Sequence, residues 1–394
     1  RFFLLAILTF ITTHSAWAQL ANWSGYKPTK FPTNVSGQIH GQARINQMKF
    51  HATNPNKMYA ITPQGGLFIT TDAATSWTVA PGTDALTAKL ASVCIDYTND
   101  QIIYLGGGDP NYWGSGAGAF KSTNGGATFS QLTGGLPTTR IVSEIIMHPT
   151  DPNTLVASTN GGIYKTTNAG VTWTAKTSTS LQFCSMKSNT TANSLILYAT
   201  TQTATPEFYR STDFGDTWTL ITAGLNNPTV APLQTGSRVA VTAADPNVVY
   251  FGMVASGGIL FKSTDGGLTF TQTKAGGSPY LTFYTDDIAD SGQGNYNFCI
   301  GVDNVDANKV WLQSHNTWYS NDSGSTWTML TFWASKVHTD MHQIGKSPYD
   351  NTKLYSCNDG GVWVSTDEGN NWTPKSDGIY AFEIGDNTGK SSPT

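Results

Sequence analysis

A short motif occurs seven times in this chain and limits the possible folds more than any other feature. Its form is Ser/Thr-x-Asp/Asn-x-Gly-x-x-aromatic, and its third positions are separated by 52, 44, 45, 52, 57 and 45 residues. A repeat of this length is typical of propellers and solenoids, in which each repeat folds as one structural unit. The third positions are Asp72, Asn124, Asn168, Asp213, Asp265, Asp322 and Asp367.

The residues of the motif are those of a hairpin turn between two strands. Asp or Asn at the third position can accept hydrogen bonds from the N–H groups of the turn. Gly at the fifth position permits positive φ. The aromatic residue at the eighth position is expected to be buried at the start of the next strand, which contributes about 2 kcal/mol. The first copy has Ala74 in place of Gly, so we expect its turn to be the least regular.

Each repeat contains four candidate strands with alternating polarity. In the third repeat these are Arg140–His148, Thr154–Thr159, Gly162–Thr167 and Thr172–Lys176. Four strands in each of seven repeats predict an all-β fold, a seven-bladed β-propeller of four-stranded antiparallel blades over residues 41–378. An open solenoid is the alternative, but repeats of four antiparallel strands normally close into a ring.

The first 18 residues have the pattern of a secretory signal peptide. A basic residue precedes the apolar run Phe2–Ile11, and Ala16-Trp17-Ala18 fits the small-x-small cleavage rule. Cleavage is expected to leave Gln19 as the first residue. The run is short for a membrane span, so we expect a secreted or cell-surface protein with no stable span after cleavage.

Two terminal segments flank the predicted ring. Residues 19–40 precede the first blade. Residues 379–394 follow the last motif and begin with Ile379–Asp386, which has the pattern of an opening strand. This strand would either complete a blade left open by the N-terminal segment or begin a further repeat.

The composition excludes one class of partner. Charged residues make up 12% of the chain, the net charge is −4, and there is no basic stripe. We therefore expect no nucleic-acid partner.

The four cysteines are Cys94, Cys184, Cys299 and Cys357. Export permits disulfides, but three of them lie on opening strands of alternate repeats. We favour buried free thiols, with Cys299–Cys357 as the one pair that merits testing.

The repeated motif resembles the Asp box of the bacterial neuraminidase repeat, and the resemblance covers nearly the whole mature chain. This box occurs in sialidases, sortilin-type receptors, two-propeller xyloglucan hydrolases and secreted Bacteroidetes proteins, including sortilin-like and glycosyl-hydrolase-like repeat proteins. The resemblance implies a bacterial, Bacteroidetes-like extracellular propeller. It says little about activity, because the box lies on the outer edge of each blade, away from the axis where ligands bind.

The resemblance to sialidases raises the question of an arginine triad. Arg210 occupies a position before a box that is Lys elsewhere, and we interpret it as structural. Arg44, Arg140 and Arg238 open the first strands of repeats one, three and five, where they could form an anion clamp. The same arginine is also common in non-enzymatic repeats of this kind. Since no Arg-Ile-Pro signature is present, we expect no sialidase activity.

Two insertions interrupt the repeats. Gly106–Gly118 contains Tyr112 and Trp113, which could stack on a sugar or a partner, or simply fix an ordinary loop. Ala275–Asn297 contains three acids without the spacing of a calcium loop. These acids are Asp286, Asp287 and Asp290.

Acids suited to glycosidase chemistry are few. That chemistry needs two carboxyl groups about 5–10 Å apart. Asp96, Glu144 and Asp340 lie on opening strands, but the sequence does not pair them. In the xyloglucan-degrading proteins that share the box, the acidic pair comes from two facing propellers, and only one propeller is visible here.

The densest polar group is His338, Asp340 and His342. Alternate residues of a strand share one face, so these three side chains would project together and could bind Zn²⁺ or another divalent ion. The alternative, which we favour, is a hydrogen-bonded cluster that braces the last blade, with no cofactor. Asn358-Asp359-Gly360-Gly361 lies on the next turn. This turn and the segment Val337–His342, together with Gly292–Tyr296 before repeat six, resemble the secreted Bacteroidetes propellers. Those proteins often carry Asp where this chain has Asn297.

Three functions remain open from the sequence. The first is a non-catalytic secreted propeller that binds an extracellular glycan or protein, with self-association into a homo-oligomer or filament as a further possibility. The second is a polysaccharide-active glycoside hydrolase, or half of a two-propeller hydrolase. The third is a metal-dependent enzyme that uses the His-Asp-His group. The missing acid pair favours the first.

Overall fold

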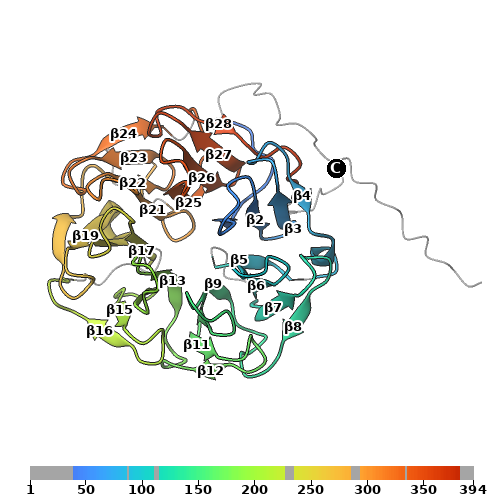
Figure 1. Cartoon of the computed structure of the whole chain (residues 1–394). Coiled ribbons are helices and arrows are strands. Elements are labelled where there is room, and N and C mark those ends of the chain that lie inside the picture. Colours follow the sequence, from blue (N-terminus) through green and yellow to red (C-terminus); the bar gives the residue numbers. More distant parts are fainter. Residues whose placement is uncertain are drawn as a thin grey trace, which may run out of the picture.

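The computed structural model describes residues 39–86, 88–110, 115–226, 235–284, 293–332 and 335–381. Seven four-stranded antiparallel sheets stand around one axis, as Figure 1 shows. The predicted all-β seven-bladed propeller is therefore confirmed. Each blade is formed by four consecutive strands paired in chain order. Within the described residues, helix is limited to short 3₁₀ turns, among them η1 (Pro81–Thr83) and η3 (Ala255–Gly257).

The strands occupy four concentric positions. The opening strands, nearest the axis, are β1 (Gln47–Phe50), β5 (Leu90–Ile95), β9 (Val142–Met147), β13 (Phe183–Ser188), β17 (Ser237–Val241), β21 (Cys299–Val302) and β25 (Met341–Lys346). The second strands are β2 (Met58–Thr62), β6 (Ile103–Gly107), β10 (Leu155–Thr159), β14 (Leu197–Thr201), β18 (Val249–Met253), β22 (Val310–Gln313) and β26 (Leu354–Asn358). The third strands are β3 (Gly66–Thr70), β7 (Ala119–Ser122), β11 (Gly162–Thr166), β15 (Phe208–Ser211), β19 (Ile259–Ser263), β23 (Thr317–Ser320) and β27 (Gly361–Ser365). The outer strands are β4 (Thr78–Val79), β8 (Ser130–Leu132), β12 (Thr174–Ala175), β16 (Thr219–Ile221), β20 (Thr271–Lys274), β24 (Thr328–Thr331) and β28 (Thr373–Pro374).

The hydrophobic core lies between the blades. Every residue of the second strands is buried, because these strands have a neighbouring blade on each face. One cluster, for example, joins Tyr59 and Ile61 of blade one to Val93 and Leu105 of blade two. The outer strands expose residues to solvent. Burial on both faces explains why the second strands lack clear polar alternation.

The Asp box forms the predicted turn between the third and outer strands. In blade five, the Ser263 hydroxyl accepts the N–H of Gly267 at 2.9 Å. The Asp265 carboxylate accepts the N–H of Thr269 at 2.9 Å and its hydroxyl at 2.6 Å. The structural role expected for the third positions is therefore observed.

The first box is as regular as the others, so the expectation of an irregular turn was wrong. Ala73 and Ala74 have φ of 57° and 64°, in the same left-handed region as Gly266 and Gly267 in blade five. Ala74 N–H donates to the Thr70 hydroxyl at 3.2 Å. The turn keeps its hydrogen bonds, and the alanines bear the steric cost of positive φ instead.

The ring closes without exchanging a strand. Trp77 of the first box donates its N–H to Asp377 O at 2.8 Å and its indole N–H to Lys375 O at 2.7 Å. The same backbone contact joins consecutive blades at Trp173 and Gly134. Blade one has four strands of its own, so the strand expected at Ile379–Asp386 is not needed to complete it.

The C-terminal segment meets the ring at its closure. Ile379 is buried in a cluster shared by blades one and seven, and residues 379–381 form no strand. The remainder of that expected strand, the predicted signal peptide and most of the segment 19–40 lie outside the described residues.

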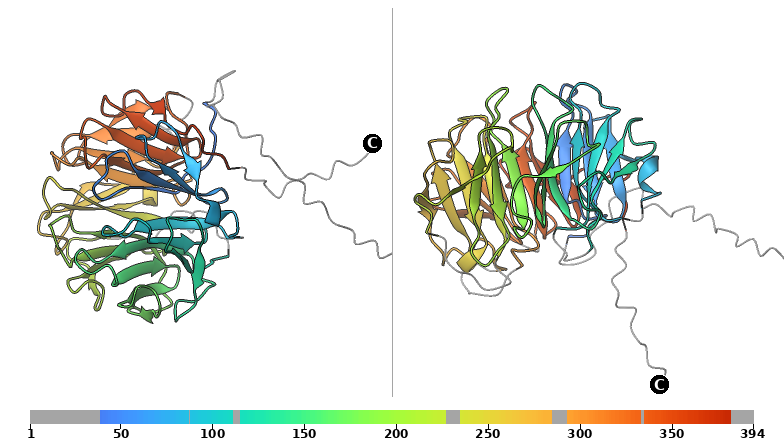
Figure 2. Two further views of the ribbon diagram at one scale, coloured as in Figure 1. Left: turned by 45° about the vertical axis from the view of Figure 1, so that its right-hand side comes forward. Right: turned by 90° about the horizontal axis from the view of Figure 1, so that it is seen from below.

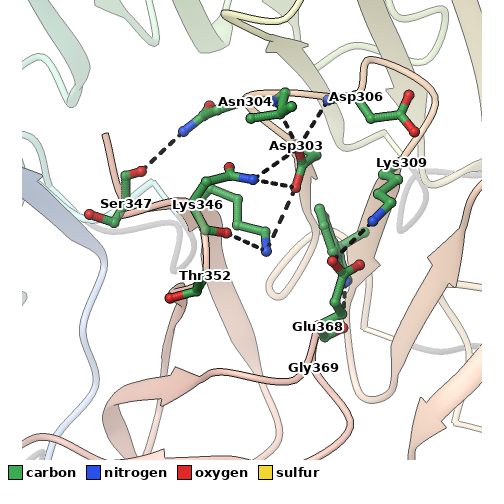
Figure 3. Close-up of polar contacts among 12 residues, drawn as sticks. Asp303, Asn304, Asp306, Lys309, Lys346, Ser347, Thr352, Glu368 and Gly369 are labelled. Atoms are coloured by element: carbon green, nitrogen blue, oxygen red, sulfur yellow. Dashed lines mark hydrogen bonds and ion pairs between the residues drawn. The ribbon is translucent and has the colours of Figure 1, made fainter. Parts of the chain in front are cut away.

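Buried charges reinforce the contact between blades six and seven, as Figure 3 shows. Asp303 and Lys346 approach at 3.6 Å with side chains 3% and 2% exposed. Lys309 and Glu368 pair at 3.0 Å nearer the surface. Arg210 acts similarly and donates to Gly266 O of the next blade at 2.8 Å, as expected for a structural arginine.

All four cysteines are free thiols, and three of them are buried. The predicted free state is confirmed, and Cys299 and Cys357 are not bonded. Among the residues that the structure describes, no helix has the length and apolar character to cross a membrane.

We predict that Asp265→Ala lowers the free energy of unfolding by about 1 kcal/mol, because the turn N–H groups lose their acceptor and the site is exposed. Asp265→Asn is the matched control, since Asn fills this position in two other boxes and keeps the Oδ1 acceptor. Urea unfolding of both variants measures the effect. Equal stability of the alanine variant and wild type would contradict the role assigned to the box.

The box acids also predict how stability depends on pH. Hydrogen bonds from Ser76 lower the pKa of Asp72 to about 2, and those from Thr269 outweigh burial and lower that of Asp265 to about 2. A carboxyl group with a depressed folded pKa stabilises the fold above its unfolded pKa, near 3.9. The free energy of unfolding should therefore fall between about pH 4 and pH 2. Urea unfolding at pH 5, 3 and 2 tests this, and a constant value across the range would refute it.

Candidate functional site

The propeller has two faces with different turns. Because the strands of each blade alternate in direction, box turns and the turns between first and second strands share one face. The turns between second and third strands and the connections between blades share the other, which we call the insertion face. The described ends of both insertions lie on it, because Gly106–Gly118 joins β6 to β7 and Ala275–Asn297 joins β20 to β21. The views in Figure 2 show the strands running between the two faces.

A carboxylate of blade seven organises a polar network on the insertion face. Asp359 lies in the turn after β26. Its Oδ1 contacts His342 Nε2 at 2.7 Å, and its Oδ2 accepts the hydroxyl of Tyr296 at 2.7 Å. Burial would raise the pKa of Asp359, but the hydrogen bond and charge of His342 outweigh it and the pKa is lowered. Asp359 is therefore held in its ionised form.

Asp340 lies beside Asp359 in a different environment. The N–H of Asp359 donates to Asp340 O at 3.1 Å, so the two backbones are joined. The Asp340 carboxyl accepts Asn297 Nδ2 at 2.6 Å and approaches His315 Nε2 at 3.6 Å. Burial, followed by the negative charge of Asp359, raises the pKa of Asp340. The two neighbouring carboxyl groups are thus shifted in opposite directions.

Arg44 extends this network to blades one and two. Its Nη2 pairs with Asp109 at 2.5 Å, and its Nη1 approaches the Tyr296 hydroxyl at 3.5 Å. Lys89 also lies 3.5 Å from Asp109. Contacts run without a break from Asp109 through Arg44 and Tyr296 to Asp359, so the network spans the closure of the ring.

Within the described part of the chain, the three opening arginines that could form an anion clamp contact different groups. Arg44 is held by Asp109. The guanidinium of Arg140 lies on Gly161, where a Cβ atom would meet its Cζ at 2.0 Å. Arg238 of β17 lines a cavity to which all seven opening strands contribute residues, and which we call the axial cavity. The Arg238 guanidinium donates to Ser237 O at 2.9 Å.

The expectation that His338, Asp340 and His342 project from one strand face was wrong. β25 begins only at Met341, and Asp340 has φ of 60°, which ends the alternation. His338 Nδ1 contacts the neighbouring Thr339 O at 2.9 Å. Asp340 and His342 instead bind different partners. Across the described ranges, no group of three or more His, Cys, Asp or Glu side chains has an arrangement suited to a metal ion.

The other candidate acids and aromatics have varied positions. Asp96 accepts the N–H of Thr98 at 2.8 Å and has a turn-forming role. Glu144 of β9 lines the axial cavity and pairs with Lys49 and Lys187. Tyr112 and Trp113, together with Asp286, Asp287 and Asp290, lie outside the described residues. Asp359, Asp109 and Tyr296 each lie in a segment that the sequence singles out. Their joint role could not be predicted there, because their partners come from other blades.

The arrangement suits hydrogen bonding to a polar ligand, and it contains two neighbouring carboxyl groups whose pKa values are shifted in opposite directions. Asp340 and Asp359 have side chains 22% and 26% exposed, so both reach solvent at the insertion face. Neighbouring carboxyl groups with pKa values shifted apart are characteristic of general acid and base pairs. Each, however, is already engaged by side chains that fix its position.

Comparisons with known proteins support the fold and leave the activity open. The model of the family described as Sortilin, neurotensin receptor 3 (Sortilin-Vps10) matches residues 117–248. A xyloglucanase of Hypocrea jecorina is 28% identical over 258 residues, which cover 62% of this chain and 25% of that protein. The chain thus spans about a quarter of the length of this curated relative.

Solved structures give the same result. The GH74 xyloglucanase of Xanthomonas campestris has a TM-score of 0.63 at 17% identity, covering 87% of this chain and 56% of that one. YCF48 of Cyanidioschyzon merolae has a TM-score of 0.55 at 15% identity, covering 85% and 96%. YCF48 bound to D1 peptide has a TM-score of 0.55 at 16% identity, covering 85% and 98%. The expected resemblance to sortilin-like Asp-box propellers is confirmed, and these structural likenesses show the fold alone.

We predict that Asp340→Ala lowers the free energy of unfolding by about 1–3 kcal/mol, because the buried Asn297 amide loses the carboxylate that accepts its hydrogen bond. Asp340→Asn should cost less, since Asn keeps an acceptor oxygen and tolerates positive φ. Chemical unfolding of the two variants measures the difference. If both variants are as stable as wild type, the network does not brace blades six and seven.

Proposed function

We propose that this protein is a secreted, non-catalytic β-propeller that binds an extracellular glycan across its insertion face. The observation that carries the proposal is the Asp359 network, a partly exposed set of hydrogen-bonding groups held rigid by blades one, two, six and seven. Alternating carboxylate, hydroxyl and imidazole groups suit the hydroxyls of a neutral sugar chain.

The dimensions of the site favour surface binding. The axial cavity beside this network has a volume of about 140 Å³, below the roughly 300–1,000 Å³ of small-molecule pockets. A ligand larger than a few atoms would therefore lie across the face. The xyloglucanase relative favours a glycan as this ligand. Because YCF48 binds a peptide, the binding experiment below also includes a peptide ligand.

Self-association is a further part of the proposal. Chain segments outside a closed ring can add to the sheet edge of a neighbouring molecule. Residues 19–40 and 379–394 are the segments in question, and a homo-oligomer or filament at the cell surface would place many insertion faces side by side.

A second candidate function is glycoside hydrolysis, which the opposite pKa shifts of Asp340 and Asp359 favour. Asp340 would be the general acid and Asp359 the general base. We rank it second because Asp359 is bound by His342 and Tyr296, and Asp340 by Asn297.

Affinity electrophoresis in gels containing xyloglucan or other neutral polysaccharides tests the proposal. We expect retention of the wild-type chain without release of reducing ends, and none of sialic acid. Asp359→Asn should weaken retention about tenfold, or 1.4 kcal/mol. Asp265→Asn, on the opposite face, is the control and should bind normally.

Two outcomes would overturn the proposal. Release of reducing ends that Asp340→Asn abolishes would establish the hydrolase. Absence of retention on every polysaccharide, with capture of a peptide ligand that Asp359→Asn weakens, would replace the glycan with a protein partner.

A further inference from the structure

The axial cavity has more positive charge than the structure neutralises. All seven opening strands contribute residues to its lining, among them Glu144 of β9, Lys187 of β13 and Arg238 of β17. Lys49 of β1 reaches Glu144 from the side away from the insertion face. The cavity and its edge therefore hold three basic side chains and one acidic side chain, in a protein whose overall net charge is −4.

Glu144 is shared by three neighbouring donors. Its Oε1 lies 2.8 Å from Lys49 Nζ, and its Oε2 lies 3.2 Å from Lys187 Nζ and 2.9 Å from Gln47 Nε2. The Glu144 side chain is only 6% exposed. One carboxylate is thus shared by two ammonium groups, so its single negative charge does not also balance Arg238.

Arg238 has no carboxylate partner among the described residues. The one hydrogen bond of its guanidinium goes to Ser237 O, although the group has five N–H donors. His342, which also lines the cavity, is engaged by Asp359. The cavity thiols do not supply a counter-charge, because burial raises the pKa of Cys299 to about 12.

The enclosure makes the unbalanced charge unfavourable. Burial, together with repulsion from Lys49 and Arg238, lowers the pKa of Lys187 despite its contact with Glu144. Lys187 and Lys49 retain 39% and 32% side-chain exposure, so both side chains reach solvent. Like charges in an enclosed site attract a mobile anion strongly.

We propose that the axial cavity is a binding site for one small oxyanion, held by Lys187 and Arg238 with Lys49 behind them. The cavity of about 140 Å³ has room for a few water molecules, each of about 30 Å³, and so for a carboxylate or a tetrahedral oxyanion. The guanidinium can bind two oxygens of such a group. This site is independent of the neutral glycan proposed for the insertion face.

Isothermal titration of the full secreted chain at low ionic strength tests this inference, with acetate and inorganic phosphate as probes. We expect saturable binding of at least one probe with a stoichiometry of one. The probe that binds distinguishes a planar carboxylate from a tetrahedral anion. Lys187→Met and Arg238→Gln should each weaken binding at least about tenfold.

The experiment includes a check of folding and a control variant. Lys187→Met leaves Glu144 paired with Lys49, so its fold can be checked by circular dichroism. Lys353→Met removes a surface lysine that pairs with Asp350 at 3.0 Å, and it should bind as wild type does. Absence of saturable binding of both probes, or equal binding by all variants, would overturn the inference. Neither result would affect retention on neutral polysaccharides.

Discussion

The hydrogen bonds inside each Asp-box turn are the interaction on which the rest of this structure depends. A hydroxyl at the first position and a carboxylate or amide at the third satisfy the N–H groups of the turn locally, as Ser263 and Asp265 do. Because the turn needs no partner from elsewhere, it fixes the hairpin of the third and outer strands and presents the aromatic residue toward the preceding blade. Seven such units of nearly equal size pack against one another and close a ring.

This arrangement separates structure from function on the two faces. On the box face, polar groups are used between blades, as in the pair of Lys165 and Asp216 at 2.6 Å. On the insertion face, the turn between second and third strands varies from the short 159–162 to the long 107–119. Change there does not disturb the hairpins. A repeat that specifies the fold so strongly therefore leaves the ligand unspecified.

The sequence predicts the box face of the propeller well and the insertion face poorly. The box predicted the blade number and the turn, and in the third repeat the predicted Thr154–Thr159 strand is β10, Leu155–Thr159. The predictions failed where a rule for regular strands was applied to a segment whose backbone conformation changes. Alternation from His338 to His342 assumed a continuous strand, but Asp340 is left-handed and the register shifts between Met341 and Gln343. Ala74 is the converse case, since the surrounding hydrogen bonds impose a conformation that its own preference opposes.

The candidate site lies where the ring closes, and this position has an energetic consequence. In the described structure, blades one and seven each consist of their own four strands. They are joined by contacts such as Gln343 with Met48 and the N–H of Gln42 with Gly360 O. The Arg44–Tyr296–Asp359 network crosses the same junction. A ligand that binds only the closed ring stabilises it by mass action, so binding at this network and closure of the propeller are thermodynamically linked. In a propeller whose first and last blades share a strand, main-chain hydrogen bonds of that strand would close the ring. Closure would then not depend on these side chains. Here the polar groups that would recognise a ligand are also among those that join the two ends of the ring.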